Sequence, residues 1–356
     1  MNIRIKKTYI CAGVNDYTID QTLSPDYKPE VGDVGIFEVI KIGKHKVVQA
    51  ETKRNATIIP GDWIMAAFGN RYATAQFEGY LPEDCFGEMH ILGAGGIVGI
   101  VKSMHYDYID IGPTTMRLIG LVKNSFGKIV NTKAHHPHKL SSFSGAAPSA
   151  TNVILSVGSA MDSGKTTTAA YLVHGLKKAG YKVAYVKLTG TAYTKDCDFN
   201  YDLGADVTAD FSDFGFPSTY LCEEAELLDL YESLLQKIIP CNPDYTLLEI
   251  ADGLYQRETK MLLANPRFKE TLHSITFSAG DSLAAINGKN MLDSLGLSPF
   301  VLSGLFTASP LMIEEVKNNI NVPVLTIEEI IDKGVELLHN HMKNISGNKS
   351  RKLGVR

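Results

Sequence analysis

Residues 157–168 read VGSAMDSGKTTT, and this stretch decides the fold of the chain around it. It follows an apolar run, NVILSVG at 152–158, and precedes a segment whose apolar residues recur at helical spacing. A glycine-rich turn between a strand and a helix offers backbone amides and the positive helix end to phosphate groups. We therefore predict a phosphate-binding loop (P-loop), because strand, turn and helix follow one another as such a loop requires.

The side chains of this loop indicate a nucleoside triphosphate held with Mg²⁺. Lys165 is expected to reach the β and γ phosphates, and the Thr166 hydroxyl to coordinate the metal ion. The spacing is a variant, because G-x-x-x-x-G-K-[ST] would begin at Ser159, whereas Gly158 stands one residue earlier. The residues expected to contact the nucleotide are Gly158, Ser159, Asp162, Ser163, Gly164, Lys165, Thr166 and Thr167.

After residue 151, apolar strands alternate with longer helical patterns, which is typical of an α/β domain with a mostly parallel sheet covered on both faces. The first helix is expected from about Gly164 to Ala179, with Gly180 in the left-handed conformation that ends it. Thr326 and Glu329 predict a capping box for a final helix. Further strands are expected at 182–188 (KVAYVKL), 245–250 (YTLLEI), 273–279 (HSITFSA), 299–305 (PFVLSGL) and 322–327 (VPVLTI).

The chain before the loop has a different pattern of apolar and turn residues. From residue 31 to about 130 it consists of short β-rich runs broken by turn residues. Residues 131–150 lose hydrophobic periodicity and gain Ser, Pro, Ala and His, which favours a connector. We therefore expect a mainly β domain at 1–130, a linker at 131–150, the P-loop domain at 151–345 and a frayed tail at 346–356.

Composition narrows the class of partner. The 356 residues include 35 Lys and Arg against 39 Asp and Glu, so the net charge of -4 provides no global field for nucleic acid or an anionic membrane. The five cysteines form no C-x-x-C pair, and no apolar run reaches the roughly 20 residues of a membrane span. We expect a cytoplasmic protein that acts on a small-molecule substrate, and a homo-oligomer stays possible.

Two strand ends add charged groups to the predicted phosphate site. The strand at 182–188 ends in Lys187, at the sheet edge where open α/β sheets bind ligands, although a solvated lysine is the alternative. The strand at 245–250 carries Glu249 near its end, where a buried acid is costly unless it faces a metal ion or a partner. We therefore expect Lys187 and Glu249 to lie near the loop.

With the loop, the stretches KLTGT at 187–191 and LEIADG at 248–253 resemble the dethiobiotin-synthetase-like branch of P-loop NTPases over about residues 152–330. That family has a loop G-T-D-T-x-x-G-K-T with the same five-residue gap after its first glycine. It also has strand ends of the form K-P-x-x-[ST]-G and V-E-G-A-G-G. Leu188 replaces the proline and Ile250 a glycine, so the match is partial.

The resemblance implies roles for further residues. Lys187 would lie beside the transferred phosphoryl group, and Glu249 would join Thr166 as a Mg²⁺ ligand. A second metal ligand would come from the acid-rich segment near Asn200, where Asp202 is the nearest match, Asp196 and Asp198 compete, and a solvated acidic loop is the alternative. Candidate substrate contacts are Thr189, Thr191 and Asp198.

These observations favour an enzyme that uses Mg-ATP to phosphorylate or activate a small metabolite, as a ligase or phosphotransferase making an acyl or carbamoyl phosphate. Lys165 and Lys187 would be its catalytic residues. The alternative is a nucleotide-dependent switch or metallochaperone-like NTPase that acts on a protein. Residues that would suit metal transfer are His135, His136, His138, Cys197 and Cys222. The sequence does not separate ATP from GTP.

Overall fold

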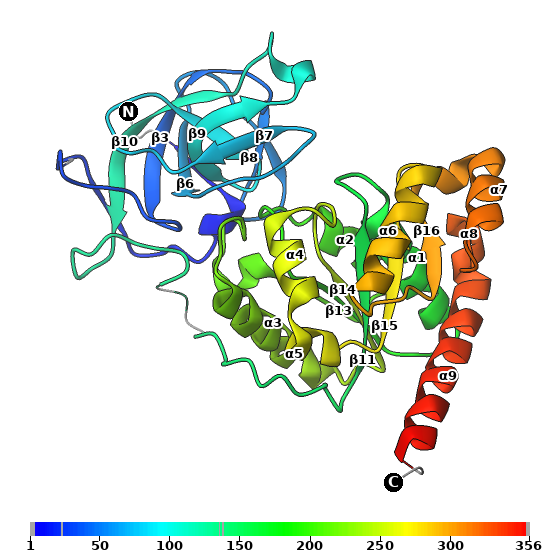
Figure 1. Cartoon of the computed structure of the whole chain (residues 1–356). Helices are drawn as coiled ribbons and strands as arrows, with labels where there is room; N and C mark the ends of the chain where they lie inside the picture. Colours follow the sequence, from blue (N-terminus) through cyan, green and yellow to red (C-terminus); the bar gives the residue numbers. More distant parts are fainter. Residues whose placement is uncertain (1–3, 23, 135, 137–138, 354–356) are drawn as a thin grey trace. The chain divides into compact units, whose positions relative to one another are not determined.

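The computed structural model describes residues 4–22, 24–134, 136 and 139–353, with side chains described as far as residue 344. The chain forms two compact units (Figure 1). We call the first the β unit, which comprises Met1–Leu140, Thr189–Thr194 and Phe211–Cys222. The second, the P-loop unit, comprises Ser141–Leu188, Lys195–Asp210 and Glu223–Arg356. Two short segments beyond the predicted linker thus belong to the β unit.

The P-loop unit is built on a parallel sheet of six strands in the order β13-β12-β14-β11-β15-β16. The strands are β11 (Asn152–Gly158), β12 (Val183–Lys187), β13 (Val207–Asp210), β14 (Tyr245–Glu249), β15 (Ser274–Ser278) and β16 (Val301–Ser303). Most strand residues are buried without alternation, because helices cover both faces of a parallel sheet. The predicted α/β fold with a parallel sheet is therefore confirmed.

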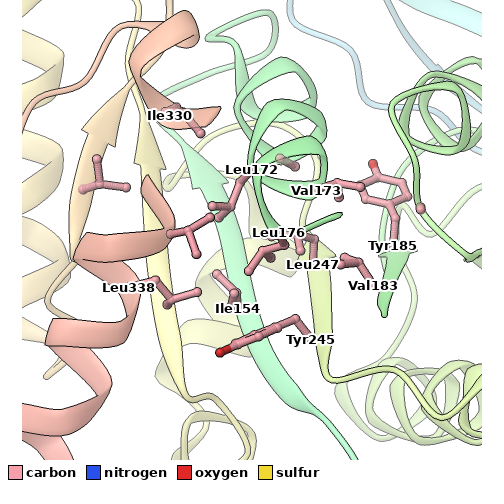
Figure 2. Packing of buried hydrophobic residues seen from close by; sticks show 14 of the residues in the cluster. Ile154, Leu172, Val173, Leu176, Val183, Tyr185, Tyr245, Leu247, Ile330 and Leu338 are labelled. Atoms are coloured by element: carbon pink, nitrogen blue, oxygen red, sulfur yellow. The ribbon is translucent and has the colours of Figure 1, made fainter. Parts of the chain in front are cut away.

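Helices α1 (Lys165–Lys178) and α9 (Val335–Leu353) pack on one face of this sheet. Figure 2 shows Leu172, Val173 and Leu176 of α1 beside Ile154 of β11 and Leu247 of β14. The remaining helices are α2 (Lys195–Asp202), α3 (Glu224–Ile238), α4 (Arg257–Ala264), α5 (Pro266–Glu270), α6 (Ser282–Ser294), α7 (Pro310–Asn319) and α8 (Ile327–Glu329). α9 continues to Leu353, across part of the expected frayed tail.

Local signals placed the helix boundaries well. α1 ends before Gly180, whose φ of +90° is the left-handed conformation expected there. Thr326 accepts the Glu329 amide and Glu329 accepts the Thr326 amide, so the predicted capping box is present at α8. Because Thr326 serves as this cap, the predicted strand at 322–327 is wrong. In the described chain that stretch contributes only the single bridge between Leu302 and Val324.

The second half of the predicted linker is fixed to α3. The Ser141 amide donates to the Ser233 hydroxyl at 2.8 Å, and the Phe143 amide donates to the Asp229 carboxylate at 2.8 Å. The Arg267 guanidinium lies 5.1 Å from the centre of the Phe143 ring. Polar side chains on α3 thus satisfy the backbone of an extended segment, which composition alone presents as a free connector.

The β unit is organised around strands that pair in a ring, β6-β3-β10-β8-β9, where β9 returns to pair with β6. Apolar side chains of these strands, among them Phe37, Phe68 and Met116, form its core. Strands of the unit are β1 (Ile5–Lys7), β2 (Thr18–Asp20), β3 (Val34–Lys41), β4 (Val47–Gln49), β5 (Asn55–Thr57), β6 (Trp63–Phe68), β7 (Phe77–Tyr80), β8 (Met89–Gly93), β9 (Ile97–Met104) and β10 (Thr115–Lys123).

Specific contacts hold the two inserted segments in the β unit. The buried Gln49 side chain donates to the Thr194 hydroxyl at 2.7 Å and accepts the Thr194 amide at 3.1 Å. The Ala192 amide donates to the Pro217 carbonyl at 2.9 Å, which joins one inserted segment to the other. A Cβ atom on Gly95 would lie 1.9 Å from the Ala192 carbonyl oxygen, so this close approach requires glycine.

We predict that the Lys44 amine of the β unit titrates well below an ordinary lysine. It lies 5.4 and 5.2 Å from the ring centres of Phe77 and Tyr108, and burial, aided by the charge of Arg71, lowers the pKa of Lys44 from 10.5 to about 8. Because the unfolded chain then binds more protons, the stability of the fold should rise with pH between about 8 and 10.5.

Carbon-13 NMR of the reductively methylated protein would measure this pKa, with Lys44→Arg to assign the signal. A Lys44 signal that titrates at the ordinary lysine value of 10.5 would contradict the prediction.

Candidate functional site

The predicted P-loop connects β11 to α1 and is held at both ends by neighbouring strands. The Ser159 amide donates to the Ser278 carbonyl of β15 at 2.9 Å, and the Leu305 amide, just after β16, donates to the Ser163 carbonyl at 3.2 Å. Asp162 and Gly164 have φ values of +60° and +100°, so the loop turns sharply before the helix begins. The C-terminal ends of three adjacent strands thus fix its shape.

Glycine is required at two places by close packing around the loop. A Cβ atom on Gly158 would lie 2.2 Å from the Ser163 hydroxyl oxygen and 2.7 Å from Cγ of Lys165. One on Gly253, after β14, would lie 2.3 Å from the Ser159 carbonyl oxygen. The unusual position of the first glycine therefore has a steric cause: the loop folds back over the end of its own strand.

Lys165 is the first residue of α1, and only 6% of its surface is exposed. Its amine donates to the Ala160 carbonyl across the loop at 2.7 Å. Burial lowers the pKa of Lys165, while the charges of Glu249 and Asp252 act in the opposite direction. A cation that is poorly solvated and held inside the loop is suited to bind phosphate oxygens.

Glu249 ends β14 and is 2% exposed, so its carboxylate depends on protein partners. One oxygen accepts the Thr166 hydroxyl at 2.9 Å, and the other accepts the Tyr185 hydroxyl at 2.9 Å. The Lys187 amine lies 3.9 Å from the first oxygen. The structure therefore brings together Thr166, Glu249 and Lys187, as the sequence predicted.

The Thr166 hydroxyl and the Glu249 carboxylate suit a hard cation. Mg²⁺ prefers oxygen ligands and uses one or two carboxylates alongside phosphates and water. Thr166 and Glu249 supply such oxygens next to Lys165, so the residues fit the ion that the loop implies. When bound, Mg²⁺ would neutralise charge on the phosphates.

Tyr185 is a site residue that was not predicted from the sequence. It lies in the middle of β12, is fully buried, and donates to Glu249. Burial, and then the negative charge of Glu249, hold the pKa of Tyr185 well above its ordinary value, so it remains a hydrogen-bond donor. The available signal was a tyrosine in an otherwise apolar strand, because a buried hydroxyl needs a partner.

The parallel register aligns polar residues in a row across the sheet. Ser156 of β11 pairs with Glu249, Glu249 pairs with Lys187, and Lys187 pairs with Asp210 at the end of β13. Asp210 is 3% exposed and was not predicted, because β13 was hidden in an acid-rich segment that we expected to be a loop. Three strands thus contribute charged groups at one level of the sheet.

The structure favours Asp196 over Asp202 as the acid near Lys187. Residues 195–202 form α2 rather than a loop, and the carboxylate of Asp196 in its first turn forms an ion pair with the Lys187 amine. Asp202 is exposed at the other end of α2, about 9 Å along the axis at a rise of 1.5 Å per residue. Asp198 lies on α2, whereas Thr189 and Thr191 belong to the β unit.

Metal transfer finds no support in the described residues. Within 4–22, 24–134, 136 and 139–353, no three His, Cys, Asp or Glu side chains gather in a way that could hold a metal ion. Cys197 and Cys222 are buried, and His135 and His138 lie outside the described residues. Over the same part of the chain, none of the helices combines the length and apolar character needed to cross a bilayer.

Removal of the Tyr185 hydroxyl, which donates to a carboxylate, should cost more stability than removal of a buried tyrosine hydroxyl whose partner is neutral. We expect Tyr185→Phe to lower the free energy of unfolding by about 2 kcal/mol, because hydrogen bonds to charged groups contribute roughly 1.5–3 kcal/mol. The matched control is Tyr231→Phe, whose buried hydroxyl faces the neutral Thr271 hydroxyl at 2.9 Å and should cost about 1 kcal/mol.

Urea unfolding measures both variants, and a Mg²⁺ titration in the presence of nucleotide adds a second readout. Tyr185→Phe should raise the Mg²⁺ concentration for half-saturation about tenfold, because it loosens a group that orients the ligand, whereas Tyr231→Phe should leave it unchanged. Equal effects of the two variants on both measurements would show that Tyr185 is only a packing residue.

Comparison with known proteins gives only structural matches of low similarity. No family model matches the chain, and no curated protein matches it. Solved structures that match include the signal recognition particle receptor FtsY from Elizabethkingia anophelis, with 14% identity and a TM-score of 0.37 over 59% of this chain and 69% of that one. Its complex with GDP matches with 15% identity and a TM-score of 0.37, over 60% of this chain and 69% of that one. FtsY from Mycoplasma mycoides matches with 14% identity and a TM-score of 0.38, over 57% and 69%.

These neighbours correct three expectations. They are receptors named for the signal recognition particle, not dethiobiotin synthetases, so the assignment to that branch is wrong. The ligase and transferase classes that followed from it are wrong with it, and so is the expectation of a small-molecule substrate as the partner. The loop and the parallel sheet by themselves support an α/β fold with a P-loop.

Proposed function

We propose that this chain is a Mg²⁺-dependent purine nucleoside triphosphatase that acts as a nucleotide-dependent switch on a protein partner. The observation that carries the proposal is the convergence of Lys165, Thr166, Glu249 and Lys187 at the C-terminal ends of β11, β12 and β14. In an open α/β sheet this edge is where ligands bind. The nucleotide-dependent switch, which the sequence analysis gave as the alternative, is the function that we propose.

The chemistry assigned to these residues is positioning and charge compensation. The loop amides and Lys165 would hold the phosphates, and Thr166 and Glu249 would hold Mg²⁺, whose chemistry when bound is charge compensation. Lys187 forms an ion pair with Asp196 and lies 3.9 Å from Glu249. A phosphate oxygen bound nearby would compete with these carboxylates for the Lys187 amine, and the pairing of Lys187 would then depend on the bound nucleotide.

Chain connectivity supports a switch. β12, which ends in Lys187, continues after Leu188 into the β-unit segment Thr189–Thr194, and β13, which ends in Asp210, continues into Phe211–Cys222. The two strand ends in the charged row are therefore linked covalently to segments that fold with the β unit. A change of pairing at Lys187 has a short route to those segments, as a nucleotide-driven transition requires.

Replacement of Lys165 tests the nucleotide site itself. Lys165→Ala should weaken Mg²⁺-dependent binding of a purine triphosphate at least about 100-fold, because it removes the buried cation that the loop would offer to the phosphates. The control is Lys178→Ala at the far end of α1, where the exposed lysine pairs with Asp332. Titration with fluorescent ATP and GTP analogues measures affinity and also decides the base preference. If neither purine triphosphate binds the wild-type chain, the proposed function is wrong.

Hydrogen exchange tests the switch separately. Amide exchange at 189–194 and 211–222 should differ between protein with a non-hydrolysable triphosphate and protein with the diphosphate, and Lys165→Ala should abolish the difference. The segment 141–144, fixed to α3, provides an internal control that should not respond. Identical exchange in both nucleotide states would leave a triphosphatase without the proposed switching role.

A further inference from the structure

A cavity of about 350 Å³ in the β unit is not explained by the nucleotide site. It lies between β1 and the segment from Ala50 to Thr57, which includes β5. All of its lining residues belong to the β unit, so it is separate from the P-loop. Four cations line it, namely Arg4, Lys6, Lys7 and Arg54, against the single acid Glu51.

Internal partners hold the two lysines of this cavity in place. Lys6 forms an ion pair with Asp62 and donates to the Thr57 carbonyl at 2.9 Å. Lys7 forms an ion pair with Glu51 at 2.9 Å. The carboxylates of Asp62 and Glu51 are thus engaged, and both lysines are held by groups from other parts of the β unit.

The two arginines have no such acid. In the part of the chain that the structure describes, neither Arg4 nor Arg54 forms an ion pair, and Arg54 donates only to the Asn55 carbonyl at 3.3 Å. Two positive charges therefore remain uncompensated at this cavity, in a chain whose net charge is -4. Such a local excess attracts anions, since clefts focus the field of charges that line them.

The chemistry of the lining indicates a phosphate group. Guanidinium groups bind phosphate through paired N–H donors, and lysines add point charges. Thr52 and Thr57, whose side chains carry hydroxyl groups, also line the cavity. The volume lies at the small end of the roughly 300–1,000 Å³ found for ligand pockets, so it suits a small molecule and not a folded partner.

We propose that this cavity, the β1 cavity, is a second anion site that binds a small phosphate-bearing molecule as a ligand, independently of the nucleotide. The proposal goes beyond the triphosphatase site and does not rest on it. The ligand is bound and not transformed, because the cavity carries cations and hydroxyl donors and its acid Glu51 is paired with Lys7.

Calorimetric titration with inorganic pyrophosphate tests the proposal on the full chain carrying Lys165→Ala, which removes the nucleotide site. Saturable binding is expected, and it should weaken at least about tenfold when chloride is raised to about 1 M, where the Debye length falls to about 3 Å. Arg4→Gln combined with Arg54→Gln should weaken it at least about tenfold as well. The matched control is Arg117→Gln on β10 of the same unit, an exposed arginine paired with Glu38, which should bind like its parent.

Thermal unfolding shows whether each variant folds. If the double variant does not fold, Arg54→Gln alone is used in the titration. Wild-type protein saturated with a non-hydrolysable triphosphate provides a second background in which the P-loop is occupied. Pyrophosphate binding in this background tests the β1 cavity, whereas binding of the triphosphate itself tests the P-loop. Absence of saturable pyrophosphate binding in both backgrounds overturns the proposal. Equal affinity in the arginine variants and in Arg117→Gln overturns it too, because binding then occurs elsewhere.

Discussion

The buried carboxylate of Glu249 constrains the rest of the candidate site. At 2% exposure it cannot be solvated by water, and an ionised acid without partners would cost several kcal/mol. Its partners come from different elements: Thr166 from the first turn of α1, and Tyr185 and Lys187 from β12. Satisfying one acid therefore fixes the end of the P-loop against two strands and keeps the metal-binding oxygens in place.

From Glu249 a row of charged residues extends outward along the sheet. Lys187 lies beside Glu249 in register and binds Asp196, which sets the first turn of α2 against the strand ends. Asp210 occupies the next place in the row. Beyond these charged groups the chain passes into segments of the β unit, where Gln49 holds Thr194 through two hydrogen bonds. The charged row thus links the nucleotide site to the β unit by covalent chain.

Local patterns predicted the features that short stretches of sequence determine. The P-loop, α1 with its terminal Gly180, and the capping box at Thr326 all depend on neighbours within a turn or two. Glu249 and Lys187 could be placed because parallel strands end at one edge. The choice of Asp196 over Asp202, the place of Asp210 and the Tyr185 bond could not be predicted, because they follow from helix α2 and from register between strands distant in sequence. The family assignment failed because lysine and glutamate at strand ends suit many phosphate sites on this architecture. The β1 cavity escaped notice because net charge averages over its local cation excess.

The most direct test of the account is the Mg²⁺ dependence of triphosphate affinity in Glu249→Gln. The wild-type chain should bind a non-hydrolysable purine triphosphate more tightly when Mg²⁺ is added, and the variant should lose at least about tenfold of that gain while its affinity without metal is unchanged. A Glu249→Gln protein that folds and retains the full gain from Mg²⁺ would contradict the role of Glu249 as the acid around which the site is built.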